Sequence, residues 1–556
     1  MADARPSQHE LDANADDDEA LRQAIALSLE EQHKTTAALI SHEKDADKPT
    51  FGTLPLDRRQ MEQERLQRLA KRRRVSSGDD VVEVPPPKKP APSKPSSQSA
   101  AALPFPNGTI KRTWARGYPR TPDDIKIEEV LQKDQLILAV LSSFQWDEEW
   151  IMSKVDLATT KLLLLAFASD DAQKEAMRSN VPPGIKFCFP PMNGPGSMHS
   201  KLQVLKYPGY LRVVVPTGNL VSYDWGESGV MENMVFLIDL PRLENPTHHT
   251  PTMFSIELRR FLSASGVDDR MVSSLSNYDF SKTRELGFVY TIPGGHMDES
   301  LKRVGYCGLG GCVAALGLAT EELVEVDLVC ASLGSVNHDL VTAIYNACRG
   351  DDGMKEYRAR TARKGSEKAA GLLESLKARF RIYFPTNQTV CQSRGGRSAG
   401  GTICIQEKWW RSPTFPRELV RDCVNTRPGL LMHSKVILVR KPVRGCLDGP
   451  RAPGLAYVGS ANLSESAWGR LVKDRASGKP KMSCRNWECG VVVPLPKVTT
   501  KGHRDGGNGG SGSGDGSAAD SQVYGMDVFT GTVPVPMRVP GRHYGAGDQP
   551  WFFQKP

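Results

Sequence analysis

The pattern of apolar and polar positions divides this 556-residue chain into two parts. From about residue 116 to residue 496, apolar strand-like segments alternate with helix-like segments, for example over 134–144 and 162–168. This alternation is typical of α/β proteins. We therefore predict an α/β fold that begins near residue 116.

Residues 1–115 lack this pattern. They are poor in aromatic residues and rich in Asp, Glu, Lys, Arg, Ser and Pro, and such a composition buries too little apolar surface to offset chain entropy. We predict a disordered tail here. We also predict a flexible insertion over the Gly- and Ser-rich residues 501–521.

One stretch of the tail, residues 16–32, has helical periodicity. The positions on one helical face are Leu21, Ala24, Ile25 and Ser28. Acidic residues precede them, at the helix end where the dipole favours negative charge. The stretch resembles the ubiquitin-interacting motif, so we predict that these residues bind ubiquitin. A nascent amphipathic helix without a partner is the alternative.

A dense basic run occupies residues 71–74 of the tail. It is typical of nuclear-import signals and nucleic-acid contacts, although a solvated charge run has the same composition. The following VVEV at 81–84 resembles a motif that adds a strand to the small ubiquitin-like modifier. We therefore predict a nuclear protein, with ubiquitin and this modifier as candidate partners of the tail.

Length and composition narrow the class of protein. A chain of 556 residues predicts two or three domains. The longest apolar run, 162–168, is far shorter than the roughly 20 residues that span a bilayer, so we expect no membrane association. Eleven cysteines without metal-site spacing predict reduced, buried thiols and no cofactor. The formal charge of +8 favours an anionic partner.

The tetrapeptide MHSK occurs twice, at 198–201 and at 432–435. Each copy begins an apolar segment, which a turn joins to a second one. A hydroxyl residue and, two positions later, an asparagine follow. These residues are Thr217, Asn219, Ser460 and Asn462. The repeat therefore extends over a whole pair of predicted antiparallel strands.

The side chains of each copy are predicted to converge, because alternate residues of a strand share one face. The converging pairs are His199 with Lys201 and His433 with Lys435. A histidine can attack phosphorus while ammonium and amide groups stabilise negative charge on the phosphate oxygens. We predict one phosphodiester site shared by two similar halves, 116–345 and 346–556. Two buried strands that happen to contain histidine are the simpler alternative.

These paired His-x-Lys motifs resemble those of the phospholipase D superfamily. Most members have an aspartate seven residues after the histidine, where this chain has Lys206 and Arg440. Loss of both acids resembles the tyrosyl-DNA phosphodiesterase branch, and the likeness extends over 120–552 through NLVSYDWGES, VGSANLSESAWG, RNWECGVVV and DQPWFF. It implies two similar α-β-α sandwich domains related by pseudo-two-fold symmetry.

The resemblance also implies roles for individual residues. His199 would attack the 3′-phosphorus to form a phosphohistidine, and His433 would protonate the leaving tyrosine and then activate water. The groups holding the phosphate oxygens would be Lys201, Lys435, Asn219 and Asn462. Glu488 would orient His199. Glu232 stands at the equivalent place in the first half and departs from the family, which often has glutamine there. The extra charge would raise the pKa of His433, unless Glu232 is a strand-edge glutamate in solvent.

The resemblance further implies a basic cleft that holds DNA through its backbone. Its predicted contacts are Ser332, Gly334, Ser335, Thr386, Ser393 and Ser464. Phe144 would meet the DNA end, with a core position as the alternative. The loop 441–453 makes the second copy longer, and the sequence does not determine whether it borders the cleft.

Taken together, the sequence favours a monomeric DNA-repair phosphodiesterase. It would hydrolyse the 3′-phosphotyrosyl bond between DNA and a topoisomerase I remnant, and act on other 3′ adducts, without a metal. A phospholipase D-type lipid hydrolase or nuclease is one alternative. A ubiquitin-binding adaptor with an inactive core is the other.

Overall fold

Two β-sheets organise the part of the chain that the computed structural model describes, residues 103–362, 374–443, 451–498 and 523–552. These residues belong to one compact unit. None of the described helices is long and apolar enough to cross a membrane. The predicted segments that lie outside the described residues are 16–32, 71–74, 81–84 and 501–521.

The first sheet has eight strands in the order β2-β1-β9-β7-β6-β3-β4-β5. Their bounds are β1 (Thr109–Thr113), β2 (Asp124–Ile125), β3 (Leu138–Ser142), β4 (Lys161–Leu165), β5 (Ile185–Cys188), β6 (Gln203–Lys206), β7 (Tyr210–Pro216) and β9 (Met234–Pro241). Side-chain alternation along β7 sends Val213 and Val215 to one face and Val214 to the other, and all three are buried. Both faces of this sheet are therefore covered.

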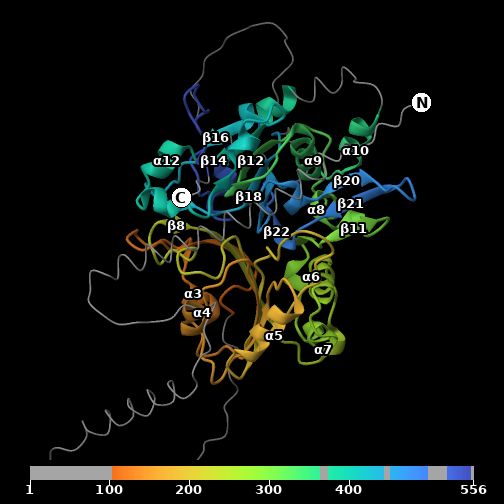
Figure 1. Ribbon diagram of the computed structural model, residues 1–556. Coiled ribbons are helices and arrows are strands. Elements are labelled where there is room, and N and C mark those ends of the chain that lie inside the picture. Colours follow the sequence, from red (N-terminus) through yellow and green to blue (C-terminus); the bar gives the residue numbers. More distant parts are fainter. Residues whose placement is uncertain (1–102, 363–373, 444–450, 499–522, 553–556) are drawn as a thin grey trace, which may run out of the picture. The chain divides into compact units, whose positions relative to one another are not determined.

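Helices provide that cover (Figure 1). α3 (Ile127–Leu131) and α4 (Glu148–Ser153) pack on the face of Val214, whereas α6 (Met253–Ala264) packs on the face of Val213. Side-chain caps fix where the longer elements start: Thr252 Oγ1 accepts the backbone N–H of Ser255 in the first turn of α6. The first half is thus an α-β-α sandwich.

The second sheet has seven strands in the order β10-β22-β19-β18-β12-β14-β16. Their bounds are β10 (Gly287–Thr291), β12 (Glu325–Val329), β14 (Phe380–Phe384), β16 (Val420–Asp422), β18 (Val436–Arg440), β19 (Gly454–Gly459) and β22 (Glu488–Pro494). The larger helices of this half are α8 (Gly305–Ala315), α9 (His338–Cys348) and α10 (Met354–Thr361).

The two sheets repeat one topology. The order β9-β7-β6-β3-β4-β5 in the first corresponds strand by strand to β22-β19-β18-β12-β14-β16 in the second. The pairing directions also agree, since β3-β4-β5 and β12-β14-β16 are parallel and the other neighbours antiparallel. This confirms the prediction of an α/β fold with two similar halves.

Short elements connect and extend the halves. Among the described residues they are α5 (Asp171–Ser179), α7 (Asp269–Ser273), β8 (Met231–Glu232), β11 (Gly294–Met297), β13 (Ser332–Leu333), α12 (Asn387–Cys391), β15 (Cys404–Ile405), α13 (Glu407–Trp410), β17 (Leu431–Met432), α14 (Glu465–Trp468), β20 (Arg470–Lys473) and β21 (Pro480–Cys484). The parallel pair β8–β17 joins a first-half segment to a second-half segment.

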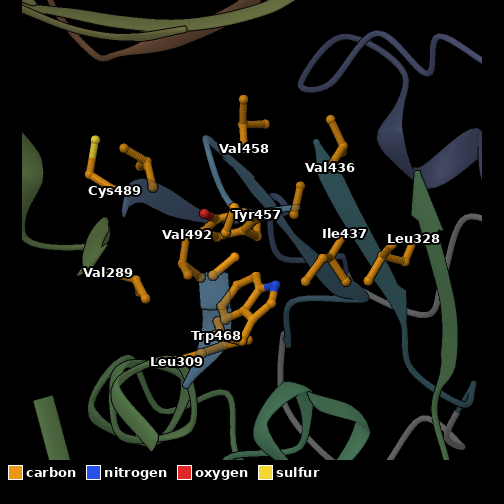
Figure 2. Packing of buried hydrophobic residues seen from close by; sticks show 14 of the residues in the cluster. Val289, Leu309, Leu328, Val436, Ile437, Tyr457, Val458, Trp468, Cys489 and Val492 are labelled. Atoms are coloured by element: carbon orange, nitrogen blue, oxygen red, sulfur yellow. The ribbon is translucent and has the colours of Figure 1, made fainter. Parts of the chain in front are cut away.

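The core of the second half is built around two large aromatic residues (Figure 2). Trp468, at the end of α14, lies near Leu309 of α8 and near Ile437 and Val492 of the sheet. Its ring centroid is 5.1 Å from that of Tyr457 in β19. Because Trp468 is 2% exposed, it fixes the short helix α14 to the core.

Two boundaries differ from those predicted. β1 lies inside the predicted tail 1–115, because its sequence TIKRT buries only Ile110 and Thr113 and depends on pairing with the distant β9. β10 and β12 belong to the second sheet, although we expected the second half to begin at residue 346, inside α9. The repeat locates the histidine-bearing strands alone, and no change in composition marks where the second sheet starts.

Candidate active site

Both histidine–lysine pairs lie in extended segments directly before a strand. We predicted that the strands begin at the histidines, but β6 and β18 begin a few residues later, at Gln203 and Val436. The four side chains are buried. Lys201 Nζ lies 3.4 Å from each ring nitrogen of His199, which confirms for the first copy that His and Lys share one face.

The predicted antiparallel return strands are present. β7 and β19 pair with β6 and β18 and end directly before Thr217 and Ser460. Lys435 Nζ, from the second half, donates to the backbone carbonyl of Thr217 at 3.2 Å. The Asn219 loop of the first half therefore meets the ammonium group of the second.

Each histidine is oriented by a carboxylate of the other half. His199 Nδ1 lies 2.9 Å from Glu488 Oε2, and His433 Nδ1 lies 3.1 Å from both carboxylate oxygens of Asp224. The backbone repeats this exchange, since the N–H groups of His199 and His433 each donate at 3.0 Å to a carbonyl of the opposite half. Because a carboxylate faces each Nδ1, Nε2 is the ring nitrogen that can face a substrate.

The hydrogen bonds define which residues are equivalent. Ser460 Oγ donates to Glu488 and accepts the N–H of Cys489. In the first half, Thr217 Oγ1 donates to Asn233 and accepts the N–H of Met234. The structural equivalent of Glu488 is therefore Asn233.

Glu232, which we had equated with Glu488, is displaced by one residue. Its backbone carbonyl accepts the N–H of His433, as that of Trp487 accepts the N–H of His199, so Glu232 corresponds to Trp487. Its carboxylate pairs with Arg427, whose guanidinium also donates to Asp124. We predicted that Glu232 lies beside His433, and this is wrong, because the acid beside His433 is Asp224. Adjacent residues of an extended segment face opposite sides, so the side chain of Glu232 points away from His433 and toward Arg427.

The two asparagines are anchored differently. The backbone N–H of Ser332 donates to Asn462 Oδ1 at 3.1 Å, so the Nδ2 group of Asn462 is the donor that a ligand could use. Asn219 Nδ2 donates to Gln145 Oε1 at 3.3 Å, and its Oδ1 is buried without a partner among the described groups. Gln145, which sequence reasoning missed, therefore orients Asn219.

Burial and crowding of positive charge tune the site. Burial lowers the pKa of Lys201 to about 8, against the opposing charges of Glu488 and Asp224. Burial together with the charge of Lys201 depresses the pKa of Lys435 well below its usual range. Burial lowers the pKa of His433 to about 4 although Asp224 opposes this, and it also lowers the pKa of His199. A bound anion would offset these effects.

A pocket adjoins His199. Its walls come from four segments of the second half and one of the first, and its lining residues are Ser197, His199, Ser332, Gly334, Ser335, Trp409, Asn462, Ser464, Glu465, Ser466, Ala467, Arg485, Asn486 and Glu488. The predicted contacts Ser332, Gly334, Ser335 and Ser464 thus come together beside the histidine. Ser464 also caps α14, because its Oγ accepts the N–H of Ala467.

The remaining predicted contacts separate into two groups. The ring of Phe144 lies 5.1 Å from that of His199, so this residue is at the site. Thr386 instead caps α12 through the N–H of Thr389, and Ser393 Oγ donates to the carbonyl of Val390. Neither is among the residues that line this pocket in the described part of the chain, so the contact of this loop with DNA stays a prediction.

The loop 441–453 adjoins the far end of the second repeat. Lys441, after β18, donates its N–H to the carbonyl of Pro453, before β19. His433 precedes β18 and Ser460 follows β19, so the described flanks of this loop lie at the opposite end of the strands from the site.

Sequence reasoning missed Asp224, Gln145, Trp409 and Arg485. Asp224 lies within the stretch NLVSYDWGES, so an acid in a family-like motif was the available signal. Arg485 likewise begins the family-like stretch RNWECGVVV, whereas Trp409 lies in no such motif. No cluster of three metal-ligating side chains is found among the residues described.

Comparisons with known proteins agree with this geometry. Residues 109–545 match the family model described as tyrosyl-DNA phosphodiesterase. The chain is 22% identical over 405 residues to tyrosyl-DNA phosphodiesterase 1 of Arabidopsis thaliana, covering 68% of this chain and 60% of the relative. It is 23% identical over 322 residues to a probable tyrosyl-DNA phosphodiesterase of Caenorhabditis elegans, covering 54% and 63%. The chain thus spans about three fifths of these relatives.

The fold is also similar to a solved structure. The crystal structure of the yeast tyrosyl-DNA phosphodiesterase superposes with a TM-score of 0.54 at 18% identity, over 80% of this chain and 100% of the yeast chain. This likeness supports the two-sandwich architecture.

Proposed function

Since the chain belongs to the tyrosyl-DNA phosphodiesterase family, we propose that it is a DNA-repair phosphodiesterase. Its substrate would be DNA joined through a 3′-phosphate to tyrosine, the remnant of topoisomerase I, and we extend the proposal to other 3′ adducts. The observation that carries it is the reciprocal pairing of His199 with Glu488 and of His433 with Asp224. That arrangement provides two oriented imidazoles for a two-step transfer.

In the first step, Nε2 of neutral His199 attacks the phosphorus. The phosphorus–nitrogen bond forms, the bond to the tyrosine oxygen breaks, and protonated His433 gives its Nε2 proton to that oxygen. The phosphate anion raises the pKa of His433, because an opposite charge favours the imidazolium. Glu488 stabilises the positive charge that develops on His199.

In the second step, His433 takes a proton from water. The new phosphorus–oxygen bond forms, the phosphorus–nitrogen bond breaks, and the product is a 3′-phosphate end with His199 restored. The donors for the non-bridging oxygens would be Lys201, Lys435, Asn219 and Asn462. These groups can offset the growing negative charge, so we propose that the reaction needs no metal ion.

A gel assay tests the proposal. Purified protein is given a single-stranded oligonucleotide ending in 3′-phosphotyrosine, in excess chelator, beside the His199→Ala variant. Conversion to a 3′-phosphate end by the wild type alone is expected. No conversion by either protein would contradict the proposal.

We also propose that the protein acts in the nucleus as a monomer and that its tail binds ubiquitin. The basic run 71–74 supports the nuclear location, and the helical motif 16–32 supports ubiquitin binding. We extend the binding proposal to the small ubiquitin-like modifier through residues 81–84. Ubiquitin binding by the full chain should be lost in Ala24→Asp and retained in Gln23→Asp, a neighbouring position off the predicted face. Equal binding by both variants would contradict it.

A further inference from the structure

The hairpin of β20 and β21 has no part in the proposed chemistry. It forms a small sheet with β11 in the order β11-β21-β20, so β20 is an edge strand. Residues 470–485 contain six Lys or Arg residues and one acid, Asp474. This hairpin is therefore a strongly basic element of the second half.

Both ends of the hairpin continue the wall of the pocket. The residues before β20, from Ser464 to Ala467, line the pocket, and Arg485 lines it directly after β21. Figure 1 shows the two blue strands β20 and β21 extending outward past β11. A molecule bound in the pocket could pass along the hairpin as it leaves.

Not every charge of the hairpin is neutralised. Lys479 pairs with Asp298 at 3.2 Å, and Lys481 pairs with Asp474 at 2.7 Å. Lys473 and Arg475, at the end of β20, are exposed. Neither side chain has a hydrogen-bond or ion-pair partner within the described residues, although the backbone of Lys473 pairs with that of Pro480. The tip of the hairpin thus presents two uncompensated cations.

We propose that this hairpin binds the phosphate backbone of the DNA substrate some distance from its 3′ end, through Lys473 and Arg475. The proposal rests on the proposed function. The pocket wall from which the hairpin extends carries Ser332, Ser335 and Ser464, whose hydroxyls suit phosphate oxygens. DNA carries a negative charge at every nucleotide, whereas the proposed reaction does not require the departing peptide to be negatively charged.

Strand geometry gives the position of the contact. A strand advances about 3.3 Å per residue, so Lys473 lies about 13 Å beyond Gly469. Duplex DNA rises about 3.4 Å per base pair. The contact should therefore involve phosphates about four base pairs from the reacting end.

The test compares a Lys473→Glu and Arg475→Glu double variant with the wild type on 3′-phosphotyrosyl duplexes of different lengths. On duplexes of about 20 base pairs, kcat/KM should fall about tenfold, and the slope of log kcat/KM against log salt should flatten by about 1.8, which corresponds to two lost phosphate contacts. The loss should shrink as the DNA is shortened below about four base pairs. The matched control, Lys161→Glu with Lys186→Glu, reverses two exposed charges of the first sheet and should change neither quantity.

An equal loss on short and long DNA, or no loss on long DNA, would overturn the proposal. So would a defect that follows the length of the peptide instead of the DNA. If the wild type cleaves no 3′-phosphotyrosyl substrate, the proposed function fails by itself. Fluorescence anisotropy with a 3′-hydroxyl duplex then decides the hairpin separately: weaker, less salt-dependent binding by the double variant supports it, and unchanged binding rejects it.

Discussion

The two histidine sites have the same geometry but obtain it from different residues. On the His199 side, the orienting carboxylate is Glu488, the first residue of β22. On the His433 side, the equivalent strand position holds Asn233, and Asp224 from the preceding loop supplies the carboxylate, with Asn233 Nδ2 donating to it at 3.2 Å. The two halves therefore share a carboxylate beside Nδ1 of the histidine, but they supply it from different positions in the chain.

Removal of either imidazole should have the largest effect on the reaction rate. His199→Asn and His433→Asn should each lower the overall rate by on the order of 10⁴-fold or more. Phenolate, with a pKa of about 10, leaves with little help, so His433→Asn should still complete step one and accumulate a covalent DNA adduct. His199→Asn should accumulate none. Denaturing gels of protein with labelled DNA measure this, and equal absence of adduct in both variants would contradict the assignment.

Removing one carboxylate charge should separate the two steps. Glu488→Gln should slow adduct formation and Asp224→Asn should slow adduct hydrolysis, each by about 10²- to 10⁴-fold, because a neutral partner no longer stabilises the imidazolium or fixes the tautomer. Single-turnover kinetics measure both steps. Glu232→Gln is the control: its carboxylate pairs with Arg427, so neither step should change by more than a few-fold. A larger change in the control would restore Glu232 to the site.

Moving the first-half carboxylate from position 224 to position 233, the equivalent of Glu488, tests whether the two halves are interchangeable. Asp224→Asn combined with Asn233→Glu gives the first half the same residue that the second half has at Glu488. The double variant should recover about tenfold of the hydrolysis rate lost by Asp224→Asn, because double-mutant coupling is strong between residues in contact. Additive losses in the two changes would show that the two halves are not interchangeable at this position.

The smallest effects should appear in the pH profile. Protonation of His199, whose pKa lies below its usual value, removes the nucleophile as the pH falls. Above about pH 8, Lys201 loses its proton and the stabilisation of the phosphate oxygens with it. Initial rates should therefore be bell-shaped, with the alkaline limb approaching about tenfold per pH unit. A flat profile from about pH 5 to 9, with binding and release shown to be fast, would contradict the pairing of roles.

The sequence predicted those parts of the site that the two halves have in common. Repetition identified the two histidines, His199 and His433, together with the paired lysines and asparagines. Asp224 has no counterpart in the repeat, since the second half has Ala467 five residues after Asn462, and so a search for equivalent acids selected Glu232. Register explains the error, because a shift of one residue in a strand turns the side chain to the other face.

The fold shows the same limit. Strands rich in Val and Leu were evident, but β1 was not, because Lys111 and Arg112 make it polar and its stability comes from a strand more than a hundred residues away. Likewise, Thr386 resembles a phosphate contact in sequence and serves as a helix cap in the fold. A hydroxyl residue next to a helix start fits both roles, and tertiary position decides between them.

Because each histidine is oriented by a carboxylate of the other half, the site can be completed only late in translation. His199 and Glu488 are separated by 289 residues. At translation speeds of roughly 5 to 20 residues per second, about 15 to 60 s pass between their emergence. The proposed nucleophile is thus synthesised long before the carboxylate that orients it, and a chain that ends before Glu488 lacks that carboxylate.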